Sequence, residues 1–332
     1  MIPHSRPCLD EVEERAAADL LRTGQLLGGG GNQGFRQAFG SSVSLFSSGR
    51  LAIQAALEAL RLPSGAGVIV QTYVCDAVIW AIQSANLQPV LCDIGASWTA
   101  TPETVESVMT DRCEAILLAP PFGFAQCDLG FHRFKLPIIR DLCQSSPATN
   151  VHSGDAAVFS FHPTKYICAA GGGAVITNNP KYRQRLISIE RRWDEVAPFS
   201  NLQAAIGACQ ISKLESFEAR RSKIFEIYRA ALPEFLTKPL LDAMDIPAGR
   251  LFRFVLDTVE KEASSFFPLF AAHGITVRNG VDQLAHRAFG LPDSVFPNAV
   301  ARLSRTLSLP FYPALRYEQA EFIAETAGRL LK

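Results

Sequence analysis

The chain has 332 residues, of which 48% are hydrophobic and 19% are charged. This composition is typical of a folded globular protein and excludes a disordered one, and the length suggests about two domains. Lys and Arg together number 32, as do Asp and Glu. The chain therefore lacks the overall positive charge that would favour nucleic acid or an anionic membrane surface as a partner.

The spacing of cysteine and histidine indicates neither a disulfide framework nor a metal site. The eight cysteines form no CxxC pair, and the six histidines form no HxxxH. We expect the cysteines to be small buried apolar groups in a reducing cytoplasm. No apolar run is long enough to span a bilayer, and residues 1–6 lack the apolar core of a signal peptide. A cytoplasmic protein without a membrane partner is the expectation.

Short apolar runs alternate with helical patterns along the first part of the chain. Residues 9–23 predict an amphipathic helix whose apolar face consists of Val12, Ala16, Leu20 and Leu21. Predicted strands follow at residues 44–46, 68–71, 89–93, 115–119 and 137–141, and predicted helices at residues 51–60, 77–85 and 101–109. Strands that are apolar on both faces predict a mostly parallel sheet covered by helices on both sides. Ligands of such sheets bind beyond the carboxyl ends of the strands, where Tyr73, Asp141 and Ser160 are expected.

The turn that carries Lys165 lies between two apolar, β-prone runs at residues 155–161 and 173–177. Lysine is rarely buried without a partner. Two interpretations remain open from this stretch alone. Lys165 is either an ordinary loop lysine with its amine in water or a lysine that forms a Schiff base with an aldehyde cofactor.

A Ser/Gly turn at residues 47–50 opens the predicted helix at residues 51–60. Free backbone N–H groups and the positive end of the helix dipole suit a phosphate there. Ordinary N-capping by Ser47 or Ser48 is the alternative. The chain has no GxGxxG after a first strand and no GxxxxGK[ST], so neither a dinucleotide fold nor a P-loop is indicated.

The pattern changes after about residue 231. Before it, residues 181–193 predict a charged helix and residues 201–231 predict one long amphipathic helix. After it come predicted strands at residues 253–256 and 275–278 and predicted helices near residues 264–272 and 317–331. We therefore predict a large α/β domain at residues 1–230 and a smaller C-terminal α+β domain at residues 231–332.

Five segments in a fixed order carry a resemblance to a known family: SSGR at 47–50, DLCQ at 141–144, FSFHPTK at 159–165, QAAIG at 203–207 and LSLPFYP at 307–313. Together they resemble the DegT/DnrJ/StrS-type sugar aminotransferases over nearly the whole chain. Members of that family are pyridoxal phosphate enzymes with the aspartate-aminotransferase fold, fold type I. The resemblance implies that fold here, and a homodimer whose active sites are completed across the interface.

The resemblance also implies a role for each side chain near the ring of the cofactor. Lys165 would bind pyridoxal phosphate as a Schiff base and then move a proton between substrate and cofactor. Asp141 would face the pyridine nitrogen, Gln144 would hydrogen-bond the ring hydroxyl and Tyr73 would stack on the ring. Without the resemblance, Asp141 would be interpreted as a helix N-cap, Gln144 as part of a solvated helix face and Tyr73 as a core tyrosine.

The phosphate would be held by the backbone amides of Gly49 and Arg50 and by the hydroxyl of Ser160. The alternative for Ser160 is a strand serine that bonds only to backbone. Arg50 replaces the more usual Thr, so its side chain either adds charge at the phosphate or points elsewhere. His162 is expected to be structural rather than catalytic.

Three departures from the family pattern concern the substrate side. Residues 196–200 replace the N-Y-R of many members, Gly171 stands where Glu is common, and residues 280–291 look trimmed. The family still implies transfer of an amino group from an amino acid, expected to be glutamate, to a nucleotide-linked keto-sugar in cell-surface polysaccharide (lipopolysaccharide) or secondary-metabolite biosynthesis. Two alternatives are a pyridoxal-phosphate-dependent sugar dehydratase or deoxygenase and a non-catalytic regulator that binds the cofactor. Lys165 and the absence of clustered cysteines count against the dehydratase types.

Overall fold

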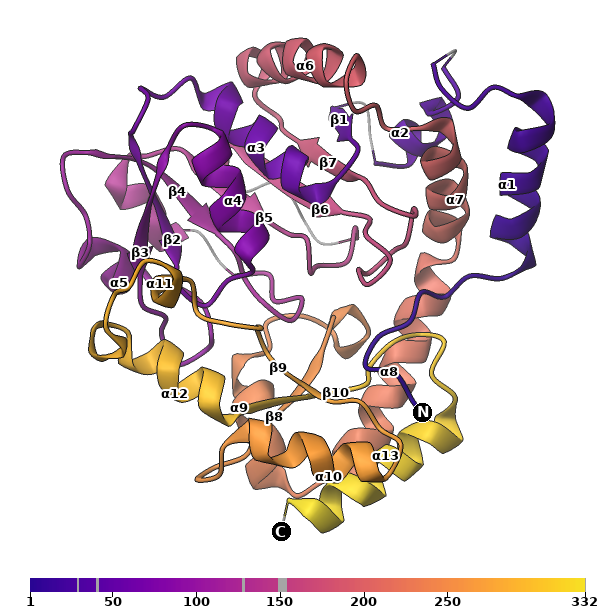
Figure 1. Ribbon diagram of the computed structural model, residues 1–332, viewed down its shortest axis with the longest axis vertical. Helices are drawn as coiled ribbons and strands as arrows, with labels where there is room; N and C mark the ends of the chain where they lie inside the picture. The colour runs from indigo at the N-terminus through magenta and orange to yellow at the C-terminus, as the bar shows by residue number, and fades with distance from the viewer. Residues whose placement is uncertain (29, 40–41, 127–128, 149–153, 332) are drawn as a thin grey trace.

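The computed structural model describes residues 1–28, 30–39, 42–126, 129–148 and 154–331. It contains a seven-stranded sheet and a three-stranded sheet, each flanked by helices (Figure 1). Gly29 of the glycine-rich opening segment and Cys127 lie outside the described residues. Within the described ranges, no helix combines the length and the hydropathy that crossing a membrane requires.

The large sheet has the strand order β1-β7-β6-β5-β4-β2-β3. Neighbours from β6 to β3 run parallel, whereas β7 runs antiparallel to both β6 and β1. The strands are β1 (Val43–Phe46), β2 (Gly67–Gln71), β3 (Gln88–Cys92), β4 (Cys113–Leu118), β5 (Ile138–Asp141), β6 (Ala156–Ser160) and β7 (Gly173–Ile176). Because β2, β4, β5 and β6 are parallel, the residues that follow them meet at one edge of the sheet.

Helices cover both faces of this sheet, which explains why its strands are continuously apolar. One face packs against α3 (Gly49–Leu60), α4 (Asp76–Ser84) and α6 (Pro180–Asp194). The other face packs against α2 (Gln33–Phe39), α5 (Pro102–Glu106) and α7 (Asn201–Ser212). The predicted α/β fold, with a mostly parallel sheet between two layers of helices, is confirmed.

The small sheet is antiparallel and has the order β8-β10-β9. Its strands are β8 (Phe254–Asp257), β9 (Arg278–Asn279) and β10 (Thr306–Leu309). The helices in this part of the chain are α8 (Leu214–Ala231), α9 (Glu234–Ala243), α10 (Phe267–Ala272), α11 (Ala285–Ala288), α12 (Pro297–Arg305) and α13 (Tyr317–Leu330). The sheet lies below the large one in Figure 1. The division into domains at residue 230 stays a prediction.

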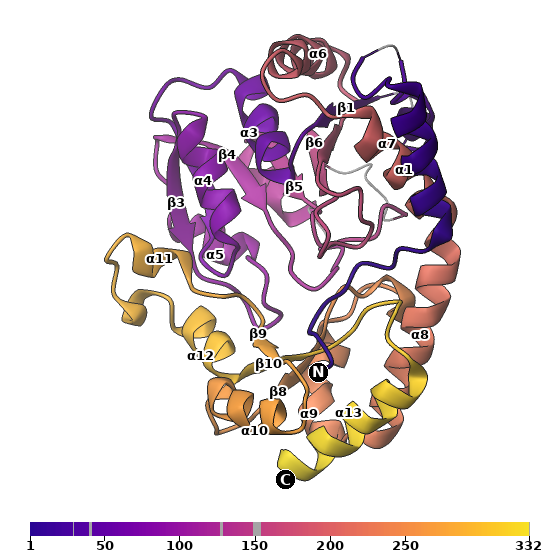
Figure 2. The ribbon, with the colours of Figure 1, turned by 45° about the vertical axis from the view of Figure 1, so that its right-hand side comes forward.

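The strand predicted at residues 275–278 is observed only as β9 at Arg278–Asn279. The backbone at residues 274–276 hydrogen-bonds to the N-terminal segment instead. Ile2 donates to the carbonyl of Gly274 at 2.6 Å, and Thr276 donates to the carbonyl of Ile2 at 3.0 Å. His4 Nε2 lies 2.9 Å from Ser308 Oγ of β10. Figure 2 shows the segment before α1 (Glu11–Thr23) running down to this sheet.

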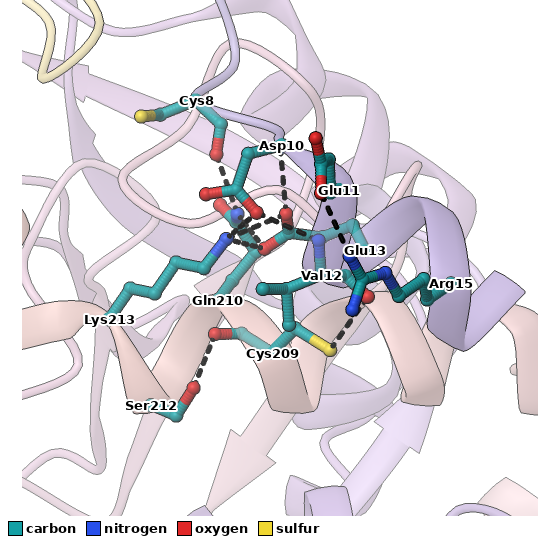
Figure 3. A network of polar contacts seen from close by, with 10 residues as sticks. All are labelled: Cys8, Asp10, Glu11, Val12, Glu13, Arg15, Cys209, Gln210, Ser212 and Lys213. Atoms are coloured by element: carbon teal, nitrogen blue, oxygen red, sulfur yellow. Dashed lines mark hydrogen bonds and ion pairs between the residues drawn. The ribbon is translucent and has the colours of Figure 1, made fainter.

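The predicted helix at residues 201–231 is broken at Lys213 into α7 and α8. The Lys213 ammonium lies 2.8 Å from Glu13 and 2.6 Å from Asp10, both at the start of α1. Gln210 of α7 also donates to Glu13, at 2.7 Å (Figure 3). The contact of α1 with α7 therefore buries Glu13, while Val12 on the predicted apolar face stays 50% exposed.

Replacing Lys213 with Met should lower the free energy of unfolding by about 2–4 kcal/mol, because Glu13 would remain buried without a cation. Urea denaturation measures the change. Lys223→Met, at an exposed position of α8, is the matched control and should change stability by less than about 0.5 kcal/mol. The double variant with Glu13→Gln should recover part of the loss. Equal stabilities for the Lys213 and Lys223 variants would contradict the assignment.

Candidate active site

The seven predicted site residues line one cavity of about 70 Å³ at the edge of the sheet where β2, β5 and β6 end. These residues are Gly49, Arg50, Tyr73, Asp141, Gln144, Ser160 and Lys165. The cavity shares Lys165 and Ser160 with a larger hollow of about 560 Å³ that reaches the small sheet. The structure thus brings together residues that lie far apart in the sequence.

Lys165 lies in the turn between β6 and β7, as the sequence pattern predicts. Its N–H donates to the His162 carbonyl at 2.8 Å, and its Nζ lies 5.8 Å from the centre of the Phe252 ring. Gly171 and Gly172 lead out of the turn with φ of +128° and +106°. Side chains rarely adopt such backbone conformations. A side chain at position 171 would therefore be strained in this backbone conformation.

Two glycine-dependent contacts join the start of α3 to β6 and β7. A Cβ on Gly49 would lie 2.6 Å from the Cβ of Ser160, and one on Gly173 would lie 2.7 Å from the Cα of Gly49. Ser48 caps the helix by accepting from the Leu51 N–H at 3.2 Å. The N-capping interpretation therefore holds for Ser48. The N–H groups in the first turn of α3 have no partner within the helix, so the N-terminus of α3 beside Ser160 can still bind an anion.

The Arg50 side chain turns to the rim of the cavity. Its guanidinium lies 4.9 Å from the centre of the Trp80 ring of α4, within the range of a cation–π contact. Arg50 is exposed. Of the two orientations left open by the sequence, the structure shows the one directed to Trp80.

Asp141 and Gln144 lie in the turn that follows β5. Asp141 is 9% exposed, and its Oδ1 accepts from the Cys143 N–H at 3.0 Å. Gln144 Oε1 accepts from the Phe122 N–H at 2.9 Å, which leaves the Gln144 amide N–H groups free to donate within the cavity. Burial, followed by the Asp141 charge, raises the pKa of the Cys143 thiol well above its usual value. Among the residues that the structure describes, Asp141 is the one carboxylate that lines this cavity.

Tyr73 lines the cavity, whereas His162 lines only the larger hollow. The Tyr73 ring is fully buried and meets the Phe122 ring edge-on at 6.4 Å. Burial raises the pKa of Tyr73, so its phenol stays neutral. His162 is part of the larger hollow, where its Nδ1 lies 3.0 Å from Thr164 Oγ1. Burial and then Lys165 lower the pKa of His162.

Sequence reasoning missed two arginines that line the larger hollow, Arg253 and Arg278. Arg253 precedes β8, and Arg278 lies in β9, so both come from the small sheet. Arg253 is a charged residue within an otherwise apolar run at residues 251–256, and this interruption could have been recognised from the sequence. The segment at 280–291, which looked trimmed, contributes Gly280 and Asp282 to the same hollow.

Comparison with known proteins agrees with this geometry. Residues 7–327 match the DegT/DnrJ/EryC1/StrS aminotransferase family. PseC of Helicobacter pylori, an aminotransferase involved in pseudoaminic acid biosynthesis, has 18% identity and a TM-score of 0.87, covering 99% of this chain and 98% of its own. DesV of S. venezuelae, in complex with a ketimine intermediate, has 24% identity and a TM-score of 0.85 over 99% of both chains. NtdA of Bacillus subtilis, with bound cofactor PMP, has 21% identity and a TM-score of 0.83 over 97% of this chain and 81% of its own. The chain therefore belongs to the DegT/DnrJ/EryC1/StrS family and is an aminotransferase.

Proposed function

We propose that this enzyme transfers the amino group of glutamate to a nucleotide-linked keto-sugar, in cell-surface polysaccharide or secondary-metabolite biosynthesis. The family match supports amino transfer, and the role of PseC in pseudoaminic acid biosynthesis supports a sugar acceptor. The observation that carries the proposal is that Lys165, Asp141 and the start of α3 line one cavity.

The cofactor is pyridoxal phosphate, and the residues of the cavity fit it. The backbone cradle at Gly49, which a Cβ would fill, suits the phosphate, and the Ser160 hydroxyl lies beside it. The Gln144 amide would donate to the ring hydroxyl, Tyr73 would cover a face of the ring, and Asp141 would face the pyridine nitrogen. When bound, pyridoxal phosphate supplies an aldehyde and an electron-accepting ring.

Lys165 would first hold the cofactor covalently. Once the donor amine replaces it, the freed Lys165 amine would remove a proton from the donor carbon and, in the second half-reaction, would give one to the acceptor carbon. The carboxylate of Asp141 would favour a protonated pyridine nitrogen, which would make the bound ring a better electron acceptor. Arg50 would contribute its backbone N–H to the phosphate, while its side chain lies on Trp80.

A homodimer is also proposed. Leu21 of α1 and Leu27 after it are 59% and 60% exposed, so α1 presents apolar side chains that a second copy would cover. Sedimentation velocity should give the mass of a dimer, and Leu21→Glu should shift it toward a monomer. A monomeric wild-type protein would contradict the proposal.

Two successive half-reactions test the function. Holoenzyme incubated with glutamate should release 2-oxoglutarate, and the aminated enzyme should then convert a nucleotide-linked keto-sugar to an amino sugar, followed by mass spectrometry. If the enzyme releases 2-oxoglutarate but then passes the amino group only to keto acids, the proposal of a sugar acceptor is wrong. No release from any amino acid would reject the transferase.

Gly49→Val should raise the dissociation constant for pyridoxal phosphate at least about tenfold, since the side chain would displace Ser160 from the cradle. Fluorescence titration of the apoprotein measures the constant. Gly34→Val is the matched control, because a Cβ on Gly34 of α2 meets nothing within 4 Å. Equal affinities in the two variants would place the phosphate elsewhere.

A further inference from the structure

His286 connects the segment between β9 and β10 to the turn that carries Tyr73. It lies in α11, is fully buried, and stacks on the Phe296 ring with the ring centres 4.3 Å apart and the planes at 15°. Its Nδ1 lies 2.8 Å from the hydroxyl of Thr72, and its Nε2 lies 2.8 Å from Oδ1 of Asp293. Both ring nitrogens of this histidine are therefore engaged, and one of them holds the residue that directly precedes Tyr73.

The hydrogen bonds around Thr72 and Asp293 give this connection a direction. The Thr72 hydroxyl accepts from the backbone N–H of His286 at 3.0 Å, and the Thr72 carbonyl accepts from the Ala285 N–H at 2.9 Å. Hydrogen bonds from Arg287, followed by the one from His286, lower the pKa of Asp293 to about 2. An ionised carboxylate only accepts, so Nε2–H of His286 donates to Asp293. In the neutral ring, Nδ1 then accepts from the Thr72 hydroxyl.

The start of the same segment contacts Tyr73 itself. A Cβ on Gly280, directly after β9, would overlap the Tyr73 hydroxyl. Val281, the next residue, lines the same cavity as Tyr73. The Tyr73 turn thus lies between Gly280 at the tip of its ring and His286 at the residue before it. The segment at residues 280–286 therefore determines where the Tyr73 ring stands in the cavity.

We propose that His286 is a positioning residue for the cofactor: through Thr72 it fixes the turn that places the Tyr73 ring against pyridoxal phosphate. His286 acts indirectly, since it lines neither the cavity nor the larger hollow. The inference rests on the proposed role of Tyr73, and it does not depend on which donor or acceptor the enzyme uses. An aromatic ring that is already held in its binding orientation favours the bound state, because less freedom is lost when the cofactor binds.

Two substitutions of His286 separate this role from a general contribution to folding. The amide oxygen of Asn can replace Nδ1, whereas the amide N–H of Gln can replace Nε2–H. His286→Asn therefore keeps the bond to Thr72 and loses the one to Asp293, and His286→Gln does the reverse. His286→Gln should raise the dissociation constant for pyridoxal phosphate about three- to tenfold, and His286→Asn should leave it within about twofold of wild type. His273→Gln, at an exposed position after α10, is the matched control.

Substitutions of Thr72 test the same bond from its other end. Thr72→Val removes the hydroxyl and keeps the branched shape, so it should raise the constant as much as His286→Gln does. The double variant should bind the cofactor no more weakly than either single variant, because both remove one interaction. Thr72→Ser keeps the hydroxyl and should stay close to wild type. Fluorescence titration of the apoprotein measures the constants, and circular dichroism in the absorbance band of the bound cofactor reports the orientation of its ring.

Wild-type affinity in both His286→Gln and Thr72→Val would overturn the proposal, and so would effects of the two that add in the double variant. Urea denaturation of each apoprotein measures stability separately. A loss of stability with unchanged affinity and unchanged cofactor circular dichroism would show that His286 only holds α11 in place. If His286→Gln does not fold, Thr72→Val and Thr72→Ser still give the comparison. The titration contains neither donor nor acceptor, so a failure of the proposed transfer to a sugar leaves this test intact.

Discussion

Lys165→Ala should reduce amino transfer by about 10⁴-fold or more, because under the proposed function one side chain would supply both the covalent link to the cofactor and the proton transfer at the donor carbon. The absorbance of the cofactor–lysine link should disappear. Borohydride, which makes that link permanent in the wild-type protein, should no longer attach the cofactor. Steady-state release of 2-oxoglutarate and absorbance spectra measure the two effects. Lys181→Ala, at an exposed position of α6, is the control.

Two further variants separate catalysis from structure at this position. Lys165→Arg keeps a positive charge but offers no amine nucleophile, so it should be as inactive as Lys165→Ala. Added methylamine should restore part of the activity of the alanine variant, because it replaces the missing base. If Lys165→Ala keeps an activity within tenfold of wild type, Lys165 is an ordinary loop lysine.

The sequence predicted those parts of the site that depend on local pattern. Lys165 lies in a turn whose strands are short apolar runs, and Asp141 ends such a run. In a parallel sheet the ends of neighbouring strands must meet, so Tyr73, Asp141 and Ser160 could be placed together from their order alone. Their proposed roles stay predictions, because they depend on the bound cofactor.

Contacts between distant segments could not be predicted in this way. At Lys213, where the predicted helix is broken, the ammonium pairs with Glu13 of α1 and with Asp10, the N-cap of α1. Likewise, Arg253 and Arg278 line the same hollow as Lys165 only because the small sheet pairs β8 and β9 with β10 and the N-terminal segment joins it. Periodicity in the sequence contains no information on these long-range pairings.

Asp141→Asn should reduce turnover by about 10²–10³-fold while leaving the fold intact, since it removes one buried negative charge and little volume. The Asn side chain can still accept from the Cys143 N–H, as Asp141 does at 3.0 Å. Loss of activity in Asp141→Asn would therefore come from the charge rather than from the turn. Single-turnover rates with glutamate measure the loss, and Asp242→Asn at an exposed position of α9 is the control.

Asp141→Ala removes both the charge and the turn contact, so comparing the two variants separates the catalytic role from the structural one. If Asp141 acts only as a cap for the turn, Asp141→Asn should stay near wild type while Asp141→Ala loses stability. If its charge acts on the pyridine nitrogen, both variants should lose turnover alike. A cofactor analogue in which carbon replaces that nitrogen then gives the decisive comparison. Wild type and Asp141→Asn should be equally slow with the analogue, because the charge has no partner there. A difference that persists with the analogue would show that Asp141 acts elsewhere in the site.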